Sequence, residues 1–202
     1  LYRQGELQAV LEKGERLSGL YPDQAFLFSL MGSAHAGLRQ WDGAIARFSR
    51  AVQLRPDIAE GHVNLGKALS EASRRKEAIA CFQTALKINP DHGDAHYSLG
   101  VALHHEGRLT EALPHLGAAV EREPNNPQLR NRLGAALCDA GRPAEAVAQF
   151  RRALEIKPGV IGTLIHLSIA YEALGRLPEE LEVLGELLKI DPGLADVRGR
   201  QL

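Results

Sequence analysis

The chain has 202 residues, of which 45% are hydrophobic and 24% charged, and its net charge is −1. A charge so close to zero gives no electrostatic attraction to nucleic acid or to an acidic membrane surface, so we predict neither as a partner. The most apolar stretch, residues 160–174, contains Gly162, His166 and Glu172, and we predict no membrane-inserted segment. The two cysteines, Cys81 and Cys138, are far apart in the predicted helices, which favours unpaired thiols and a cytoplasmic location.

A strict period organises the chain. Proline occupies six positions at one constant interval: Pro22, Pro56, Pro90, Pro124, Pro158 and Pro192. A period of this length is typical of stacked supersecondary units, each of which buries its apolar face against its neighbours. The sequence therefore predicts an α-solenoid with a long exposed surface.

Each unit contains two predicted helices of about 12 to 14 residues. In one unit the first helix has an apolar stripe from Leu65 to Ala72, and the second has one from Ala78 to Leu86. Three glycines stand where a first helix should end and the chain should turn left-handed: Gly107, Gly141 and Gly175. Pro143 and Pro178 stand at or just before the start of a second helix. Pro114 falls inside a second helix, near its fourth residue, and should cost one backbone hydrogen bond.

Small and bulky residues recur at fixed places within the period. Gly32, Gly66, Gly100 and Gly134 form one column in the first helix, and the second helix carries alanine, an aromatic or leucine, and a second alanine before the proline. This pattern resembles the tetratricopeptide repeat, a helix–turn–helix unit with the same period. The resemblance implies an all-α fold, a right-handed α-solenoid, in which the glycine and the first alanine of the second helix face each other.

The resemblance covers almost the whole chain. It implies a partial unit at 1–24, full units at 25–58, 59–92, 93–126 and 127–160, a divergent unit at 161–194, and the start of a further helix at 195–202. In the divergent unit Ser168, Glu180 and Leu187 replace small residues. We predict that these residues push the two helices of 161–190 apart and leave Leu181, Leu184 and Leu188 partly uncovered, which would allow self-association.

The search for chemistry gives no catalytic or metal-binding motif. His92 with His96, and His104 beside His105, are the best metal candidates, but the ligand spacings of zinc sites are missing. No glycine-rich phosphate loop or nucleophile elbow is present. We therefore expect no cofactor, no metal and no enzymatic activity in these residues.

A peptide-binding surface is the favoured interpretation. In tetratricopeptide proteins the first helices line a concave groove, and the resemblance assigns to it Phe26, Ser29, Ser33, Glu60, Val63, Asn64, Lys67, Asp94, Tyr97, Val101, His104, Asn131, Arg132, Cys138, Ile165, His166 and Ile169. The alternative is that these are solvated helix positions. The bulky apolar groups among them favour a ligand.

The predicted function is a non-catalytic protein-interaction scaffold whose groove binds an extended or helical segment of a protein or peptide partner. The charges along the groove predict a neutral to mildly basic ligand with apolar anchors. The alternative is the substrate-selecting arm of a larger transferase, of glycosyltransferase or sulfotransferase type, whose catalytic domain is not part of these 202 residues.

Overall fold

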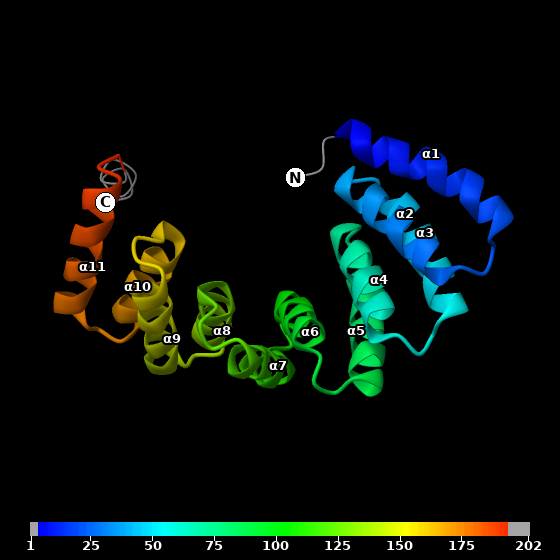
Figure 1. The fold of residues 1–202 in the computed structure, drawn as a ribbon. Helices are drawn as coiled ribbons and strands as arrows, with labels where there is room; N and C mark the ends of the chain where they lie inside the picture. The colour runs from blue at the N-terminus through cyan, green and yellow to red at the C-terminus, as the bar shows by residue number, and fades with distance from the viewer. Residues whose placement is uncertain (1–3, 194–202) are drawn as a thin grey trace. The chain divides into compact units, whose positions relative to one another are not determined.

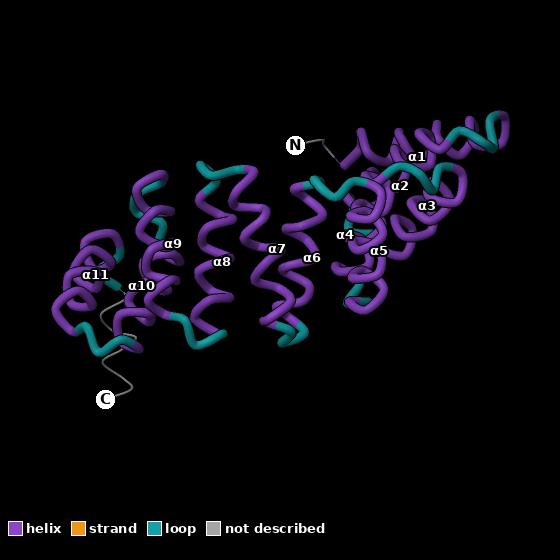
Figure 2. Tube along the Cα trace, turned by 90° about the horizontal axis from the view of Figure 1, so that it is seen from below, coloured by secondary structure: helices purple, strands orange, loops and turns teal. Residues whose placement is uncertain are grey.

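The computed structural model describes residues 4–193, and within them every regular element is an α-helix (Figures 1 and 2). The prediction of an all-α fold is confirmed, whereas the helix start predicted at 195–202 lies outside the described residues. The helices are α1 (Gln4–Leu20), α2 (Ala25–Gly37), α3 (Trp41–Leu54), α4 (Ala59–Glu71), α5 (Arg75–Ile88), α6 (Gly93–His105), α7 (Leu109–Arg122), α8 (Pro127–Asp139), α9 (Pro143–Ile156), α10 (Ile161–Ala173) and α11 (Leu177–Ile190).

The helices repeat with the period of the sequence. From α2 onward, each first helix is followed by a slightly longer second helix, and helices of one kind begin at the same interval that separates the recurrent prolines. Pro143 is the first residue of α9, where its missing N–H costs little. Pro114 is the sixth residue of α7 rather than near the fourth, so the prediction of its position was wrong by two residues. The carbonyl of Thr110, four residues earlier, loses its usual helical donor there.

The turn between the two helices of a pair uses one left-handed residue. Gly107, Gly141 and Gly175 have φ angles of 72°, 70° and 66°, which confirms the predicted left-handed turns. The same place in the two preceding pairs is held by Arg39 and Ser73, with φ angles of 58° and 63°. These two residues therefore have a backbone conformation that glycine adopts more easily.

The chain forms two compact units, residues 1–102 and 103–202. In the first unit each helix from α1 to α4 packs on the next one in the chain. Leu11 and Met31 are at the centre of one apolar cluster and Val63 of another. In the second unit each helix from α7 to α10 packs on the next, and α8 also contacts α10. This last contact places the first helices of neighbouring pairs side by side.

The glycine column faces the aromatic column of the second helix. A Cβ atom added to Gly66 would lie 2.5 Å from Cε1 of Phe82, and one added to Gly134 would lie 2.5 Å from Cε1 of Phe150. Gly32 meets Phe48 in the same way, at 2.7 Å. The atoms nearest to each added Cβ all belong to the aromatic ring, and the expectation that the glycine also faces the first alanine stays a prediction.

The last helix pair departs from the others as its sequence does. Ser168 is buried, and its hydroxyl donates a hydrogen bond to the carbonyl oxygen of Ile165 at 3.2 Å. Leu187 is buried too. The prediction of partly uncovered leucines is confirmed, since Leu181 is 58% and Leu188 41% exposed, and Leu184 is half-buried. The predicted separation of α10 and α11 and the predicted self-association stay predictions.

Candidate functional site

The first helices carry the predicted binding residues, and in the first unit the most exposed apolar one is Phe26 on α2. Phe26 is 78% exposed, and Leu30, one turn further along, is 44% exposed. Ser33 is exposed and Ser29 half-buried, and the Ser33 hydroxyl donates to the Ser29 carbonyl oxygen at 3.0 Å. Residues four apart on a helix lie on one face, so Phe26 and Leu30 form an apolar strip. Leu30 was not among the predicted site residues.

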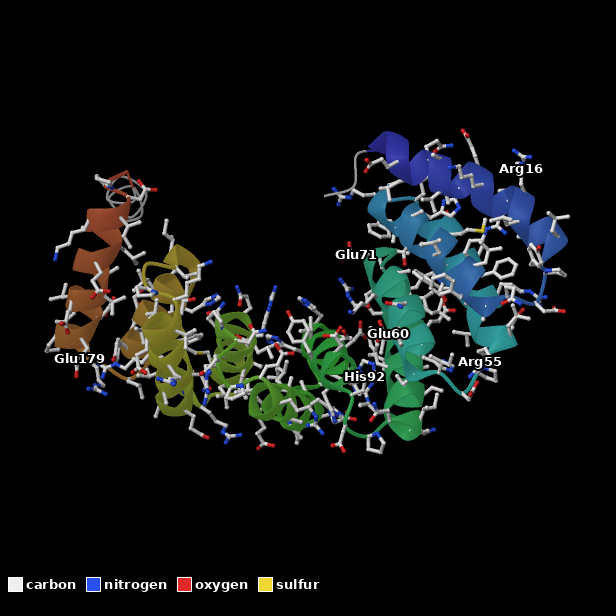
Figure 3. All side chains as sticks on the ribbon, in the orientation of Figure 1. Arg16, Arg55, Glu60, Glu71, His92 and Glu179 are labelled. Carbon is white, nitrogen blue, oxygen red and sulfur yellow. The ribbon has the colours of Figure 1, made fainter. Side chains whose placement is uncertain are left out.

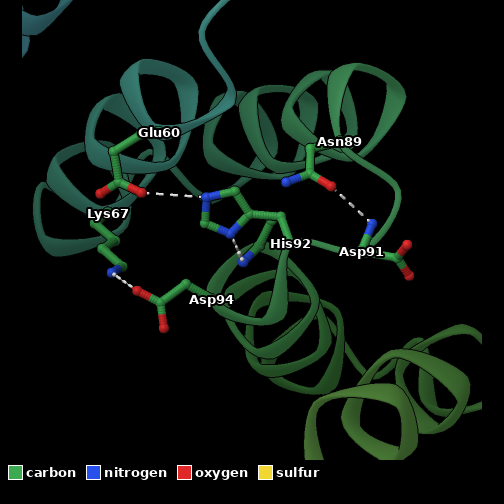
Figure 4. A network of polar contacts seen from close by, with 7 residues as sticks. Glu60, Lys67, Asn89, Asp91, His92 and Asp94 are labelled. Atoms are coloured by element: carbon green, nitrogen blue, oxygen red, sulfur yellow. Dashed lines mark hydrogen bonds and ion pairs between the residues drawn. The ribbon is translucent and has the colours of Figure 1, made fainter. Parts of the chain in front are cut away.

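A polar network joins α4 to the start of α6 (Figures 3 and 4). Nε2 of His92 donates a hydrogen bond to Oε2 of Glu60 at 3.1 Å. Two turns further along α4, Nζ of Lys67 donates to Oδ2 of Asp94 at 2.9 Å. Both pairs are at the surface and connect one first helix to the next. Lys67 and Asp94 therefore neutralise each other, and neither is a free charge for a ligand.

One predicted binding residue of the first unit is not accessible. Val63 is 0% exposed and packs against Ala59, Ala85 and Ala95. The assignment of Val63 to the binding surface was wrong, because its side chain fills the space between α4, α5 and α6. Asn64, Tyr97 and Val101 are half-buried on the first helices α4 and α6.

Two further pairs connect first helices in the second unit. Nε2 of His104, at the end of α6, lies 2.6 Å from Oδ2 of Asp139 at the end of α8. Nδ1 of His166 on α10 lies 3.2 Å from Oδ1 of Asn131 on α8. Burial lowers the pKa of His166, and the positive charge of Arg132 lowers it further. The contact between His166 and Asn131 connects α8 to α10.

The accessible part of the second unit combines aliphatic side chains with one charged group from each of two helices. Ile165 and Ile169, one turn apart on α10, are 36% and 46% exposed. Arg132 on α8 is exposed and forms no ion pair with another described residue, and the same holds for Glu172 on α10. The surface therefore offers an apolar strip with locally balanced charge.

Cys138 lies beside these residues but is a poor nucleophile. Burial raises the pKa of its thiol, and the negative charge of Asp139 raises it further. His104, the histidine that contacts the neighbouring residue Asp139, is bound to that carboxylate. A protonated thiol without a base does not support covalent catalysis.

Two histidines at the same place in successive repeats, His62 and the metal candidate His96, have structural partners. His62 and His96 each donate from Nε2 to the carbonyl oxygen of the recurrent proline six residues earlier, at 3.0 Å and 2.9 Å. Arg130, at the same place in the next repeat, does the same to Pro124 at 2.8 Å. No group of three or more His, Cys, Asp or Glu side chains within residues 4–193 is arranged to hold a metal ion.

A recurrent ion pair at the start of the second helices was visible in the sequence as Arg-x-x-Glu but was not among the predictions. It joins Arg74 to Glu77, Arg108 to Glu111, Arg142 to Glu145, and Arg176 to Glu179. The hydrogen bond to the arginine lowers the pKa of each glutamate, and the first-turn position also suits a negative charge. These pairs support the helix starts and leave the binding surface unaffected.

Comparison with known proteins identifies the repeat. The family model described as tetratricopeptide repeat matches residues 29–74, 63–116 and 107–161, which together span more than half of the chain. No described helix has the length and apolar character needed to span a bilayer. The search of curated protein sequences gave no significant match.

Solved structures share the fold. YrrB, described as a TPR protein with an unusual peptide-binding site, has a TM-score of 0.81 at 24% identity over 95% of this chain and 100% of its own. MamA has a TM-score of 0.77 at 21% identity over 85% of this chain and 94% of its own. The MamA fragment from Desulfovibrio magneticus RS-1 has a TM-score of 0.79 at 20% identity, over 83% and 95% of the two chains.

Proposed function

Because this chain belongs to the tetratricopeptide repeat family, we propose that it is a non-catalytic protein-interaction scaffold. Its first helices bind an extended or helical segment of a protein partner. The observation that carries the proposal is the exposure of Ile165 and Ile169 on a first helix, beside Arg132. Phe26 and Leu30 on α2 give the first unit a similar apolar strip. The peptide-binding site described for YrrB supports a peptide ligand for a chain of this fold.

The charges on this surface favour a ligand of low net charge. Lys67 is paired with Asp94, and His104 with Asp139, so these groups are already satisfied without a ligand. Arg132 and Glu172 remain available for hydrogen bonds in the second unit, and their charges balance. Affinity then comes from aliphatic or aromatic side chains of the ligand, and the polar groups fix its register.

The test starts from a peptide selected on the full chain from a random display library. Replacing Ile165 and Ile169 by serine should weaken its binding at least tenfold, which corresponds to about 1.4 kcal/mol. The matched control replaces Leu181 and Leu188 by serine, since these leucines are at least comparably exposed but lie on a second helix. Arg132→Ala and Tyr97→Ala should also weaken binding. Equal loss in both double-serine variants, or loss only in the control, would refute the assignment.

The transferase-arm alternative stays a prediction. No observation within the described residues favours it over a scaffold, because the binding surface would serve either protein in the same way.

A further inference from the structure

A second concave site lies among the last repeats, apart from the residues of the first-helix surface. A cavity of about 350 Å³ opens between the second helices α9 and α11, and α10 forms its floor. Leu154, Leu167 and Val183 give it apolar walls, and glutamates of α11 stand along one side. Its volume lies at the lower end of the range of ligand pockets. Glu179, labelled in Figure 3, marks the end of the cavity near the start of α11.

The floor of this cavity contains a buried polar group without a partner. Tyr171 on α10 lines the cavity and is 0% exposed, and its hydroxyl forms no hydrogen bond to a described residue. A buried hydroxyl without a partner is unfavourable. Packing does not require a tyrosine hydroxyl here, because the same place in the preceding first helices holds other residues: His35, Leu69, Leu103 and Leu137. From the unpartnered hydroxyl we expect a ligand with a hydrogen-bonding group.

Two guanidinium groups lie against the Tyr171 ring. The Cζ atoms of Arg176 and Arg151 lie 5.2 Å and 5.7 Å from the ring centre, within the range of cation–π contacts. Arg176 is also bound to Glu179. The guanidinium groups occupy the ring, and the hydroxyl, which is itself buried in the free protein, is the part of this side chain left without a partner.

The wall of α11 carries an excess of carboxylates. Glu182 and Glu186 stand four residues apart on one helix face, where like charges repel each other. Neither forms an ion pair with another described residue, whereas Glu155 at the opposite wall is bound to Arg152. No preceding second helix has a glutamate at either of these two places. The place of Glu182 is held by Ala46, Ala80, Pro114 and Ala148, and the place of Glu186 by Arg50, Thr84, Ala118 and Arg152.

We propose that this cavity binds a lysine side chain of a partner protein. The methylene stem lies between Leu154, Leu167 and Val183, and the ammonium group donates hydrogen bonds to Glu182, Glu186 and the Tyr171 hydroxyl. An ammonium has three donors in a compact group, which matches two carboxylates and one hydroxyl oxygen. This site does not depend on the first-helix surface.

The experiment uses the full chain and two matched probes. Nα-acetyl-lysine N-methylamide and its norleucine counterpart share the hydrocarbon stem, but only the lysine carries an ammonium group. Nuclear magnetic resonance should show saturable shifts at Val183 and Tyr171 with the lysine probe and at least tenfold weaker binding of the norleucine probe. Equal binding of the two probes, or no shifts at these residues with lysine, would overturn the proposal.

Variants separate the roles of the residues. Glu182→Gln with Glu186→Gln should weaken lysine binding at least tenfold, whereas Glu106→Gln with Glu121→Gln, which removes two exposed carboxylates outside the cavity, should leave it unchanged. Tyr171→Phe should weaken binding while the melting temperature stays the same or rises, because the hydroxyl has no partner in the free protein. A lower melting temperature of Tyr171→Phe, or equal binding by the two glutamine double variants, contradicts the assignment.

Discussion

The two non-glycine residues at left-handed turn positions provide a quantitative test of the repeat. Arg39 and Ser73 have φ angles of 58° and 63°, at the place where Gly107, Gly141 and Gly175 have angles of 66° to 72°. The left-handed conformation costs a residue with a Cβ roughly 1–2 kcal/mol. Replacement by glycine removes this cost but adds about 0.5–1 kcal/mol of conformational entropy in the unfolded chain. Arg39→Gly and Ser73→Gly should each stabilise the protein by about 0.5–1 kcal/mol, the difference between these two costs.

Replacing a glycine at this turn position by alanine tests the cost of the left-handed conformation in the opposite direction. A Cβ atom added to Gly107, Gly141 or Gly175 meets no atom within 4 Å, so any loss of stability in Gly141→Ala comes from the backbone conformation and not from a clash. We expect a loss of about 1 kcal/mol, which is roughly 2–4 °C in melting temperature for a chain of this size.

The assay is urea unfolding followed by circular dichroism, with thermal melts in parallel. Arg39→Ala is the control for loss of the arginine side chain, because alanine keeps the cost of the left-handed turn; it should give no gain. The reasoning fails if Arg39→Ala stabilises as much as Arg39→Gly, or if Gly141→Ala leaves the unfolding midpoint unchanged.

Two other predictions concern packing and acid sensitivity. Gly134→Ala should destabilise by about 1–3 kcal/mol, because its Cβ would lie 2.5 Å from the Phe150 ring, and Phe150→Leu in the same chain should recover part of the loss in urea unfolding. The Arg–Glu pairs hold the pKa of the glutamates, such as Glu145, below the ordinary 4.5. Their contribution to the free energy of unfolding is therefore complete above pH 4.5 and is lost as the pH falls through the lowered pKa. A variant with glutamine at Glu77, Glu111, Glu145 and Glu179 should show a smaller decrease of the urea midpoint between pH 6 and pH 3 than the parent chain. An unchanged pH profile would show that these exposed pairs contribute nothing measurable.

The constant spacing of the prolines allowed much of the fold to be predicted from the sequence. Proline and glycine act locally, through fixed φ and tolerance of the left-handed region, so their effect on helix ends can be read without knowing the neighbours. The left-handed turns at Arg39 and Ser73 could be inferred only from the period, since neither residue type favours that conformation. In these two turns the packing of the helix pair overrides local preference.

The binding surface was harder to predict because it depends on contacts between repeats. Val63 occupies a position that helical periodicity assigns to the outer face of α4, yet it is buried between three helices. Lys67 and Asp94 belong to different repeats, so the sequence of one helix cannot reveal that they neutralise each other. Accessibility and free charge on a repeat surface are properties of neighbouring helices together.

The contact between the glycine column and the aromatic column explains how the last repeat tolerates a larger residue. Glycine stands opposite Phe48, Phe82 and Phe150, where the ring leaves no room for a Cβ atom. In the divergent pair serine replaces glycine at position 168, and the residue at the place of the aromatic is Leu184. A leucine is smaller than a phenylalanine and can move its methyl groups away from the serine, so the two changes compensate in volume. Another repeat has Gly100 in the glycine column and Leu116 in the aromatic column. A leucine in the aromatic column therefore allows glycine or serine opposite it, whereas a phenylalanine requires glycine.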